Sequence, residues 1–263
     1  MDLVDNYGNG GIVTVADTSG TGFFVNKSII ADDGSVYYFG YGVGGGLIAK
    51  VDPDGILDTA YADSGFYYTG ITTDELESGL FLSDGSLIAV GADGNGVSDA
   101  NGILVKLDNT GTPVSGFGSG GRLEINYGGE DYLYVITPSN DETTFYVGGE
   151  LDSDLLVSKF NMNGQLITGF GTNGFYTNTA YHKALAITED TAGRVAVVAN
   201  VEVQAHRALI IINQDASVVN DYSELPNFYN DIFNIEFTSN GKYKVYYGGS
   251  SQCFIKQYNF DGS

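Results

Sequence analysis

Residues 107–121 read LDNTGTPVSGFGSGG, and this stretch decides the fold because it recurs along the chain. Residues 51–65 read VDPDGILDTAYADSG, and residues 160–174 read FNMNGQLITGFGTNG. In each copy a polar turn ends in Gly, and an aromatic residue follows after five residues. A repeat of about fifty residues is typical of solenoids, propellers and arrays.

The remaining copies show how the repeats are arranged. A degraded copy, NQDAS, occupies residues 213–217 and is followed later by Tyr222. The fifth copy is split, because the chain ends in YNFDGS at residues 258–263 and carries YGNGG at residues 7–11. Placing Ser263 before Leu3 restores the five-residue spacing. The two termini therefore supply parts of one repeat, as a closed ring requires, whereas an open solenoid needs atypical capping repeats.

Each repeat contains four strand signals, which are short runs of Val, Ile, Tyr and Phe between Gly, Asp, Asn and Ser. The predicted first strands are residues 28–31, 79–82, 132–136, 184–187 and 233–237, and a tight turn follows each. The predicted fourth strands are residues 12–15, 66–69, 123–126, 175–177 and 227–229. Asp-Gly and Asn-Gly in several of these turns favour hairpins.

These signals predict an all-β, five-bladed β-propeller of four-stranded antiparallel blades. Residues 12–15 would join the C-terminal blade and close the ring. At this length we expect a single domain over residues 1–263, since large all-β domains often reach this size. The repeat units are residues 16–69, 70–126, 127–177, 178–229, and 230–263 together with 1–15.

The repeated pattern, Asn/Asp-x-Asp-Gly-x-Leu-Asp-x-x-Phe-Gly-x-Gly-Gly after a strand ending in Gly, resembles the bacterial delta-sixty repeat. The match covers nearly the whole chain. It is good in the first three units, split in the fifth and poor in the fourth, where residues 215–217 and 225–226 replace the glycines. The resemblance implies propeller blades of exported, surface or fibre-like proteins, mostly without known activity.

Charge and composition limit the partners. With 33 acidic and 11 basic residues the formal net charge is −22, which argues against nucleic acid and against anionic membranes. No apolar run approaches the ~20 residues of a membrane helix, so we expect no membrane insertion. No signal peptide is visible at residues 1–5. We expect an extracellular, cell-surface or virion location, with export information outside this chain or travel within a larger assembly.

Candidate catalytic groups are few, so we predict no catalytic residues and no enzyme activity. The two histidines, His182 and His206, lack a recognisable triad context, and no Gly-x-Ser-x-Gly motif is present. The acidic residues Glu75 and Glu77, or Glu130 and Asp131, could flank a glycosidase cleft, but the sequence does not place them there. Cys253, the single cysteine, starts a predicted strand, and we expect it to be buried and inert.

One loop offers a weak metal candidate. Residues 93–102 read DGNGVSDANG, so that Asp93, Asn95 and Asp99 supply oxygen ligands. The loop lacks the terminal Glu of an EF-hand, and an ordinary polar connection also explains it. Calcium is therefore the one ion considered, and no other cofactor is predicted.

Binding is expected on one face of the propeller. Connections between the second and third strands vary from blade to blade, and antiparallel strands place the fourth-to-first connections at the same face. Binding residues concentrate on loops that a rigid scaffold carries, and tyrosine beside carboxylates suits sugars or protein partners. The predicted ligand-binding residues on this variable face are Asp74, Glu75, Tyr127, Glu130, Tyr132, Tyr181, His182, Tyr229 and Asp231.

These observations predict a non-enzymatic recognition or adhesion module of a surface, fibre or phage-tail type protein. Its partner would be a surface glycan or a cell-surface protein, and it could belong to a larger fibre or homo-oligomer. The alternative is a structural or assembly propeller in a fibre or virion with no small ligand. A glycan hydrolase is a remote alternative.

Overall fold

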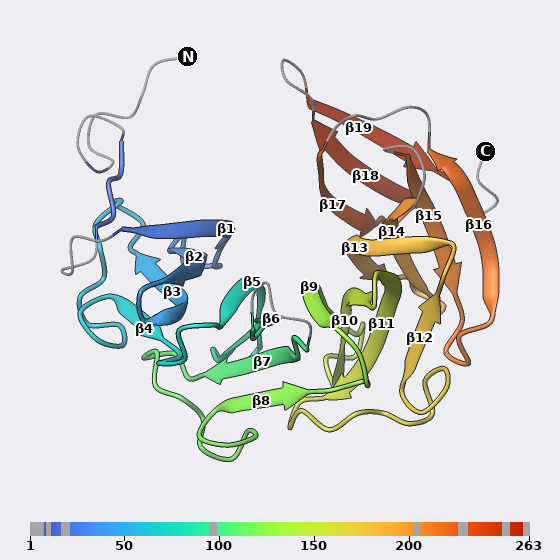
Figure 1. Cartoon of the computed structure of the whole chain (residues 1–263). Helices are drawn as coiled ribbons and strands as arrows, with labels where there is room; N and C mark the ends of the chain where they lie inside the picture. Colours follow the sequence, from blue (N-terminus) through green and yellow to red (C-terminus); the bar gives the residue numbers. More distant parts are fainter. Residues whose placement is uncertain are drawn as a thin grey trace. The chain divides into compact units, whose positions relative to one another are not determined.

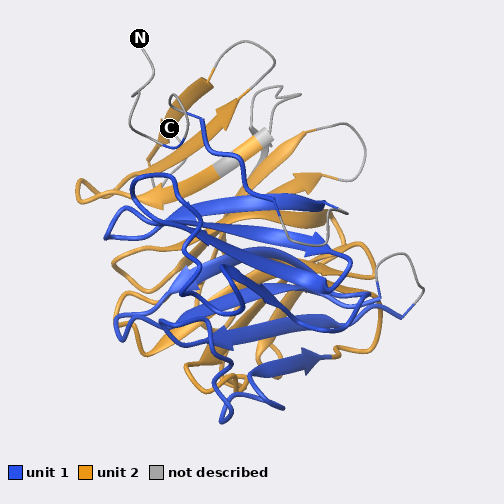
Figure 2. Cartoon of the chain, turned by 90° about the vertical axis from the view of Figure 1, so that its left-hand side faces the viewer, with its two compact units in different colours: residues 1–125 blue, residues 126–263 orange. Residues whose placement is uncertain are grey.

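The computed structural model describes residues 8, 12–16, 22–94, 99–201, 206–225, 231–248 and 253–259. Every regular element in these residues is a β-strand, and the strands form five antiparallel sheets (Figure 1). Each sheet follows the chain order, as propeller blades do. The predicted five-bladed β-propeller fold is confirmed. The chain divides into two compact units, residues 1–125 and 126–263 (Figure 2).

The first unit contains two four-stranded sheets, each in the strand order of the chain. The first sheet consists of β1 (Phe23–Ile30), β2 (Val36–Gly42), β3 (Gly45–Val51) and β4 (Phe66–Tyr68). The second consists of β5 (Glu75–Phe81), β6 (Leu87–Ala92), β7 (Gly102–Leu107) and β8 (Arg122–Ile125).

The second unit contains the other three sheets. The third sheet consists of β9 (Asp131–Pro138), β10 (Thr144–Leu151), β11 (Asp154–Asn161) and β12 (Phe175–Asn178). The fourth consists of β13 (Tyr181–Glu189), β14 (Val195–Val201), β15 (Arg207–Ile212) and β16 (Val218–Leu225). The fifth has three strands among the described residues, namely β17 (Asp231–Phe237), β18 (Tyr243–Gly248) and β19 (Cys253–Tyr258).

Within each unit the apolar core lies between consecutive sheets. In the first unit Phe39 and Ile48 of the first sheet pack in one cluster with Leu76 of the second. In the second unit one cluster joins the third and fourth sheets, and another joins the fourth and fifth. Near-continuous apolar runs such as β15 are buried because a sheet between two neighbours is covered on both faces.

The first strand of every sheet carries a β-bulge. The pairing with the second strand shifts at Val25/Lys27, Leu76/Ser78, Gly148/Gly149, Ala184/Ala186 and Ile232/Asn234. A side chain on Gly40, Gly91 or Gly149 would collide with the backbone carbonyl of Phe24, Glu75 or Tyr132. This close approach explains why the second strands of the first three sheets carry Gly at this position.

Aspartates organise the turns that join the first and second strands. Asp33 and Asp84 each accept the backbone N–H two residues later, at 2.8 and 2.9 Å. Asp141 does the same with Thr143 at 3.0 Å. Asx turns of this kind explain the predicted hairpin signals. Asp108 repeats the arrangement in the turn after β7, where it accepts from Thr110 and Thr112, both at 2.9 Å.

We expect acid to destabilise the protein through these turns. Hydrogen bonds, largest from the Ser86, Thr110 and Ser139 hydroxyls, lower the pKa of Asp84, Asp108 and Asp141, the last to about 2. Because these native pKa values lie below those of the unfolded chain, the stabilisation is present above about pH 4 and is lost as pH falls through the native values. Thermal melts between about pH 5 and pH 2 would measure this loss.

The control is the triple variant Asp84→Asn, Asp108→Asn and Asp141→Asn. Asn keeps an acceptor for the turn but does not titrate, so the melting temperature should fall less steeply with pH. Equal slopes in the variant and the wild type would show that these carboxylates do not cause the acid sensitivity.

The repeated lysines have structural partners. Lys50, Lys106 and Lys159 stand five residues before the turn Gly, which predicts an ion pair or a packed stem within each blade. The Lys50 ammonium lies 2.9 Å from the Asp58 carboxylate and faces two tyrosine rings. Lys159 lies 4.7 Å from the ring centroid of Tyr146. The predicted structural role is confirmed at these two positions.

Three expectations differ from the structure. The fourth strand of the fourth sheet was expected at residues 227–229, but it is β16, because the degraded repeat has no long Gly-rich connection after its turn. Cys253 was expected to be buried, but it is exposed, because β19 is the outer described strand of its sheet. Residues 12–16 have a single bridge at Ile12 and no strand, so their pairing with the C-terminal blade stays a prediction.

Candidate functional site

The connections of the predicted binding face follow the second and fourth strands of each sheet. Two groups of polar side chains occur there, one in each unit. The first surrounds Arg122 in the second sheet, and the second surrounds Tyr132 and Tyr181 in the third and fourth sheets. Tyr229 lies outside the described residues. Asp231 begins β17, where its backbone pairs with Gly248.

Asp74 belongs to a buried ion-pair network. It precedes β5 and is 1% exposed. The guanidinium of Arg122, from β8, donates to both of its carboxylate oxygens, at 2.8 and 3.0 Å. Arg122 also contacts Asp93 at 3.2 Å and Glu124 at 3.3 Å. Burial opposes the charge of Arg122, but the hydrogen bond and charge of Asp74 outweigh it and raise the pKa of Arg122.

The weak calcium candidates lie beside this network. One Asp93 oxygen accepts the N–H of Asn101 at 3.0 Å, and the other contacts Arg122. Asp99 is exposed, and Asn95 lies outside the described residues. Over the residues that the structure places, no group of three or more His, Cys, Asp or Glu could hold a metal. The described part of this loop is therefore organised around Arg122.

Glu75 follows Asp74 on β5 and is half-buried. Its backbone pairs with Ala92, directly before the bulge in this strand. Glu77 is the extra residue of this bulge, but burial still alternates, so that Glu75 and Glu77 are both half-buried and Leu76 between them is buried. Bulges often re-aim side chains near functional sites, which keeps this end of β5 a candidate surface.

Tyr127 is held by packing and hydrogen bonds. Its hydroxyl donates to the Ser158 Oγ at 2.6 Å, and its ring meets the edge of Phe175 at a centroid distance of 4.9 Å. Its backbone N–H donates to the buried carboxylate of Asp131 at 2.8 Å. Burial raises the pKa of the Tyr127 hydroxyl. These contacts give Tyr127 a structural role between β9 and its neighbours.

Tyr181 is also anchored. It is 3% exposed, and its hydroxyl lies 2.5 Å from both carboxylate oxygens of Asp221 on β16. Burial, followed by the hydrogen bond to Asp221, raises the pKa of Tyr181. His182 is half-buried beside it. The sequence did not indicate Asp221, because it lies in the degraded repeat, where the alignment with the other copies is poorest.

Tyr132 belongs to a polar and aromatic group that we call the β9–β13 group, formed by Tyr132, Tyr134, Glu150 and Lys183. The rings of Tyr132 and Tyr134 are nearly parallel, at 9° and a centroid distance of 6.2 Å. The Tyr134 hydroxyl donates to Glu150 at 2.7 Å. The Lys183 ammonium lies 3.5 Å from the centroid of the Tyr134 ring. These contacts bring an aromatic pair, a carboxylate and an ammonium together.

Sequence reasoning found Tyr132 and missed the other three members. Tyr134 is the extra residue of the bulge in β9, and it stands two residues after Tyr132, so that strand alternation places both on one side. Glu150 pairs directly with Tyr132. The two glycines before it, Gly148 and Gly149, were the sequence signal that could have indicated its position. Lys183 corresponds to Tyr132 in the next sheet, but the repeats diverge there too far for the sequence to align them.

Glu130 holds two loops together through its backbone. Its N–H donates to the Asp152 carboxylate at 2.9 Å, and its carbonyl accepts the N–H of Asp152 at 2.9 Å. Asp152 and Ser153 have φ of 49° and 72° and form the tight turn between β10 and β11. The loop before β9 is thereby tied to the loop after β10, and this positions the start of the strand that carries Tyr132.

Comparisons with known proteins bear on the fold of the chain. No family model matches the chain, and no curated protein matches it in sequence. A protein of unknown function from Bacteroides caccae is 13% identical, with a TM-score of 0.50, over 85% of this chain and 73% of its own. The Dos1 propeller is 13% identical, with a TM-score of 0.52, over 89% of this chain and 55% of its own.

Two further solved structures are similar to this chain in fold. The WD40 domain of Neurospora crassa Pan2 is 11% identical, with a TM-score of 0.53, over 89% of this chain and 62% of its own. The periplasmic gluconolactonase of Pseudomonas aeruginosa is 14% identical, with a TM-score of 0.52, over 88% of this chain and 72% of its own. The chain thus spans between about half and three quarters of these four proteins. At such identities the likeness establishes the propeller fold and nothing about activity.

Proposed function

We propose that this chain is a non-enzymatic recognition module that binds a surface glycan, with the β9–β13 group at the centre of its contact surface. The observation that supports this function is the parallel pair of Tyr132 and Tyr134 beside the Glu150 carboxylate and the Lys183 ammonium. A tyrosine ring offers an apolar face to a sugar, while the carboxylate accepts from sugar hydroxyls and the ammonium donates to them.

The roles within the group follow from its contacts. Lys183 covers one face of Tyr134, so we assign stacking of the sugar to Tyr132, which is half-buried. Glu150 accepts the Tyr134 hydroxyl with one oxygen, and a carboxylate has further lone pairs for a ligand. Tyr181 and Tyr127 support the loops and are not assigned to the ligand. The proposal includes an extracellular, cell-surface or virion location.

A single site of this kind should bind weakly. An aromatic contact adds about 1 kcal/mol beyond area burial, if aromatic pairs are a guide. Useful affinity would then come from several sites or several chains acting together. Weak binding at many sites fits a module of a fibre or a homo-oligomer. The binding assay therefore has to present the protein in many copies.

The test is a glycan array with the protein coupled to beads, comparing wild type, Tyr132→Ala and Asn109→Ala. Tyr132→Ala should weaken each contact about fivefold, the equivalent of about 1 kcal/mol. Asn109 is exposed in the turn after β7, at the opposite end of its sheet from the binding loops, so Asn109→Ala should bind normally. Binding that survives Tyr132→Ala but is lost in Asn109→Ala would show that the ligand binds at the opposite end of the blades. That result would contradict the proposed site.

The same surface also suits a protein partner, because tyrosine is enriched at protein interfaces. An array without any glycan signal, together with a permanent protein neighbour in the native particle, would contradict the glycan proposal. That result would favour the structural propeller instead.

A further inference from the structure

Two aromatic rings lie stacked and open to solvent at the end of the first sheet that carries the turn from β2 to β3. Phe24 of β1 is 66% exposed. Its ring stacks on Tyr41 of β2, with 5.0 Å between the ring centroids and 21° between the ring planes. We call these two residues the Phe24–Tyr41 pair. Single exposed apolar side chains are ordinary, but a stacked aromatic pair offers a flat surface that a ligand can cover.

Phe24 stands at the position of Tyr132 in the repeat. Each of them is followed by one further regular pair and then by the β-bulge of its sheet. Their partners on the second strands are Tyr41 in the first sheet and Glu150 in the third. The first sheet therefore carries an aromatic ring where the third sheet carries the tyrosine that we assign to sugar stacking.

The repeat does not bury this position between sheets. Glu75 holds it in the second sheet, where one regular pair and the bulge again follow. Lys183 corresponds to it in the fourth sheet. Glu75, Tyr132 and Lys183 are all half-buried, and Phe24 is more exposed than any of them. The exposure of Phe24 thus belongs to a position that the fold leaves open.

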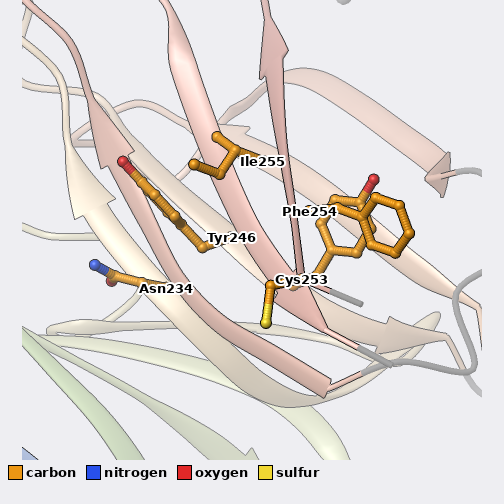
Figure 3. A pocket seen from close by; sticks show the side chains of 6 residues that line it. Asn234, Tyr246, Cys253, Phe254 and Ile255 are labelled. Carbon is orange, nitrogen blue, oxygen red and sulfur yellow. The ribbon is translucent and has the colours of Figure 1, made fainter. Parts of the chain in front are cut away.

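The apolar groove of the fifth sheet has a different character. It is lined by Asn234, Tyr246, Tyr247, Cys253, Phe254 and Ile255 (Figure 3). Tyr246 forms the first pair after the bulge, with Asn234. The corresponding residues Phe39, Val90 and Val198 are fully buried. Phe39 and Val198 belong to the clusters that join consecutive sheets, so we assign this groove to sheet packing and no ligand to it.

Polar groups lie beside the Phe24–Tyr41 pair within the first unit. Asn26, the extra residue of the bulge in β1, donates from its Nδ2 to the carbonyl of Leu76 on β5 at 3.1 Å. Glu75 precedes Leu76, so this bond holds the start of β5 beside β1. Tyr41 adds a phenolic hydroxyl, which can both donate and accept a hydrogen bond.

We propose that the Phe24–Tyr41 pair is a second sugar-binding platform of this chain, and that it takes an uncharged sugar. The inference rests on the glycan recognition proposed above. The apolar face of a pyranose ring would stack on Phe24, and the Tyr41 hydroxyl would bond to a sugar hydroxyl. With a platform in each unit, the chain itself would supply part of the multivalency that weak contacts need.

The charges around the pair define the class of sugar. The β9–β13 group contains Lys183, whereas the corresponding residue beside the Phe24–Tyr41 pair is Glu75, whose carboxylate repels a carboxylated sugar. The net charge of −22 acts in the same direction. Lys27, the one lysine of β1, stands beyond the bulge opposite the buried Phe39 and is itself half-buried.

The chain contains no tryptophan, so one substitution can report on the pair. Phe24→Trp keeps an aromatic face and introduces a single fluorophore. We expect saturable emission changes at millimolar concentrations of at least one methyl glycoside of glucose, galactose, mannose or N-acetylglucosamine, and smaller changes with methyl glucuronide. Ile30→Trp is the matched control, because Ile30 is 73% exposed at the opposite end of the same strand. Its emission should not respond.

The glycan array separates this proposal from the function on which it rests. Phe24→Ala should weaken each contact with uncharged glycans about fivefold, as for Tyr132→Ala, while Ile30→Ala binds normally. Circular dichroism would confirm that the variants fold.

Unchanged array binding in Phe24→Ala, no emission change in Phe24→Trp, or equal changes in both tryptophan variants would each overturn the platform and leave glycan recognition standing. A larger response to the glucuronide would overturn the assigned class of sugar. An array without signal from the wild type would instead contradict glycan recognition itself, and the platform with it.

Discussion

Deleting residues 1–15 should lower the melting temperature by roughly 10 °C and cause association of the chain. The sequence predicts that residues 12–15 join the C-terminal blade, so the deletion would remove Val13 and Val15 from the fold. Burial of one such side chain contributes about 1.5–3 kcal/mol, so a total loss of at least about 3 kcal/mol is expected. An open, apolar strand edge also favours pairing between molecules. Melting curves and light scattering after size exclusion would measure both effects.

A shorter deletion separates this effect from trimming a terminus. Removing residues 1–6 keeps Gly8, its hydrogen bond to Asp54 and residues 12–15. That variant should melt close to the wild type and stay in the same oligomeric state. If the longer deletion is also monomeric with unchanged melting, the N-terminal segment contributes nothing to the fold and the predicted ring closure is wrong.

Much of the architecture could be predicted because one unit is repeated. The turns after the third strands, such as residues 107–111, lie where the pattern placed them, and five sheets follow from five copies. The sequence pattern placed the beginnings of the first strands later than the structure does. β5 begins at Glu75, whereas the apolar pattern indicated residues 79–82. Leu76 is the one apolar residue among residues 75–78, although Ser78 is buried as well, so an apolar pattern misses the beginning of this strand.

The fourth repeat shows the limit of the pattern. Ala216 takes φ of 59° where the better copies have Gly, and no Gly-rich connection follows it. The strand β16 therefore starts soon after the turn, earlier than the spacing of the other copies predicts. Asp221 lies on this strand, and its contact with Tyr181 could not be read from an alignment of repeats.

The binding residues were harder to predict than the strands, because contacts between distant strands decide which tyrosines support the loops. Tyr127 stands in a connection and Tyr181 begins β13, and their hydroxyls are bonded to Ser158 and Asp221. Such partners are distant in the sequence and come from other strands. Residue type and spacing could indicate a loop rich in tyrosine and carboxylates, but not which of its members support the loop.

Replacing Arg122 by Met should produce the largest loss of stability among single substitutions near the binding loops. Arg122 is the cation that the structure places against the buried Asp74 carboxylate. Removing one partner of a buried ion pair leaves an uncompensated charge and typically costs about 3–5 kcal/mol. We therefore expect the free energy of unfolding from urea titration to fall by about that amount at neutral pH.

The double variant Asp74→Leu with Arg122→Met distinguishes a lost ion pair from lost packing. If the buried charge causes the damage, removing Asp74 as well should restore most of the stability, since apolar replacements of buried pairs are often neutral. Glu124→Gln is the matched control, because Glu124 is a largely exposed partner of Arg122 and should cost no more than about 1 kcal/mol. Additive losses in the double variant would instead mean that Asp74 and Arg122 act independently, and Asp74 would then be available to a ligand.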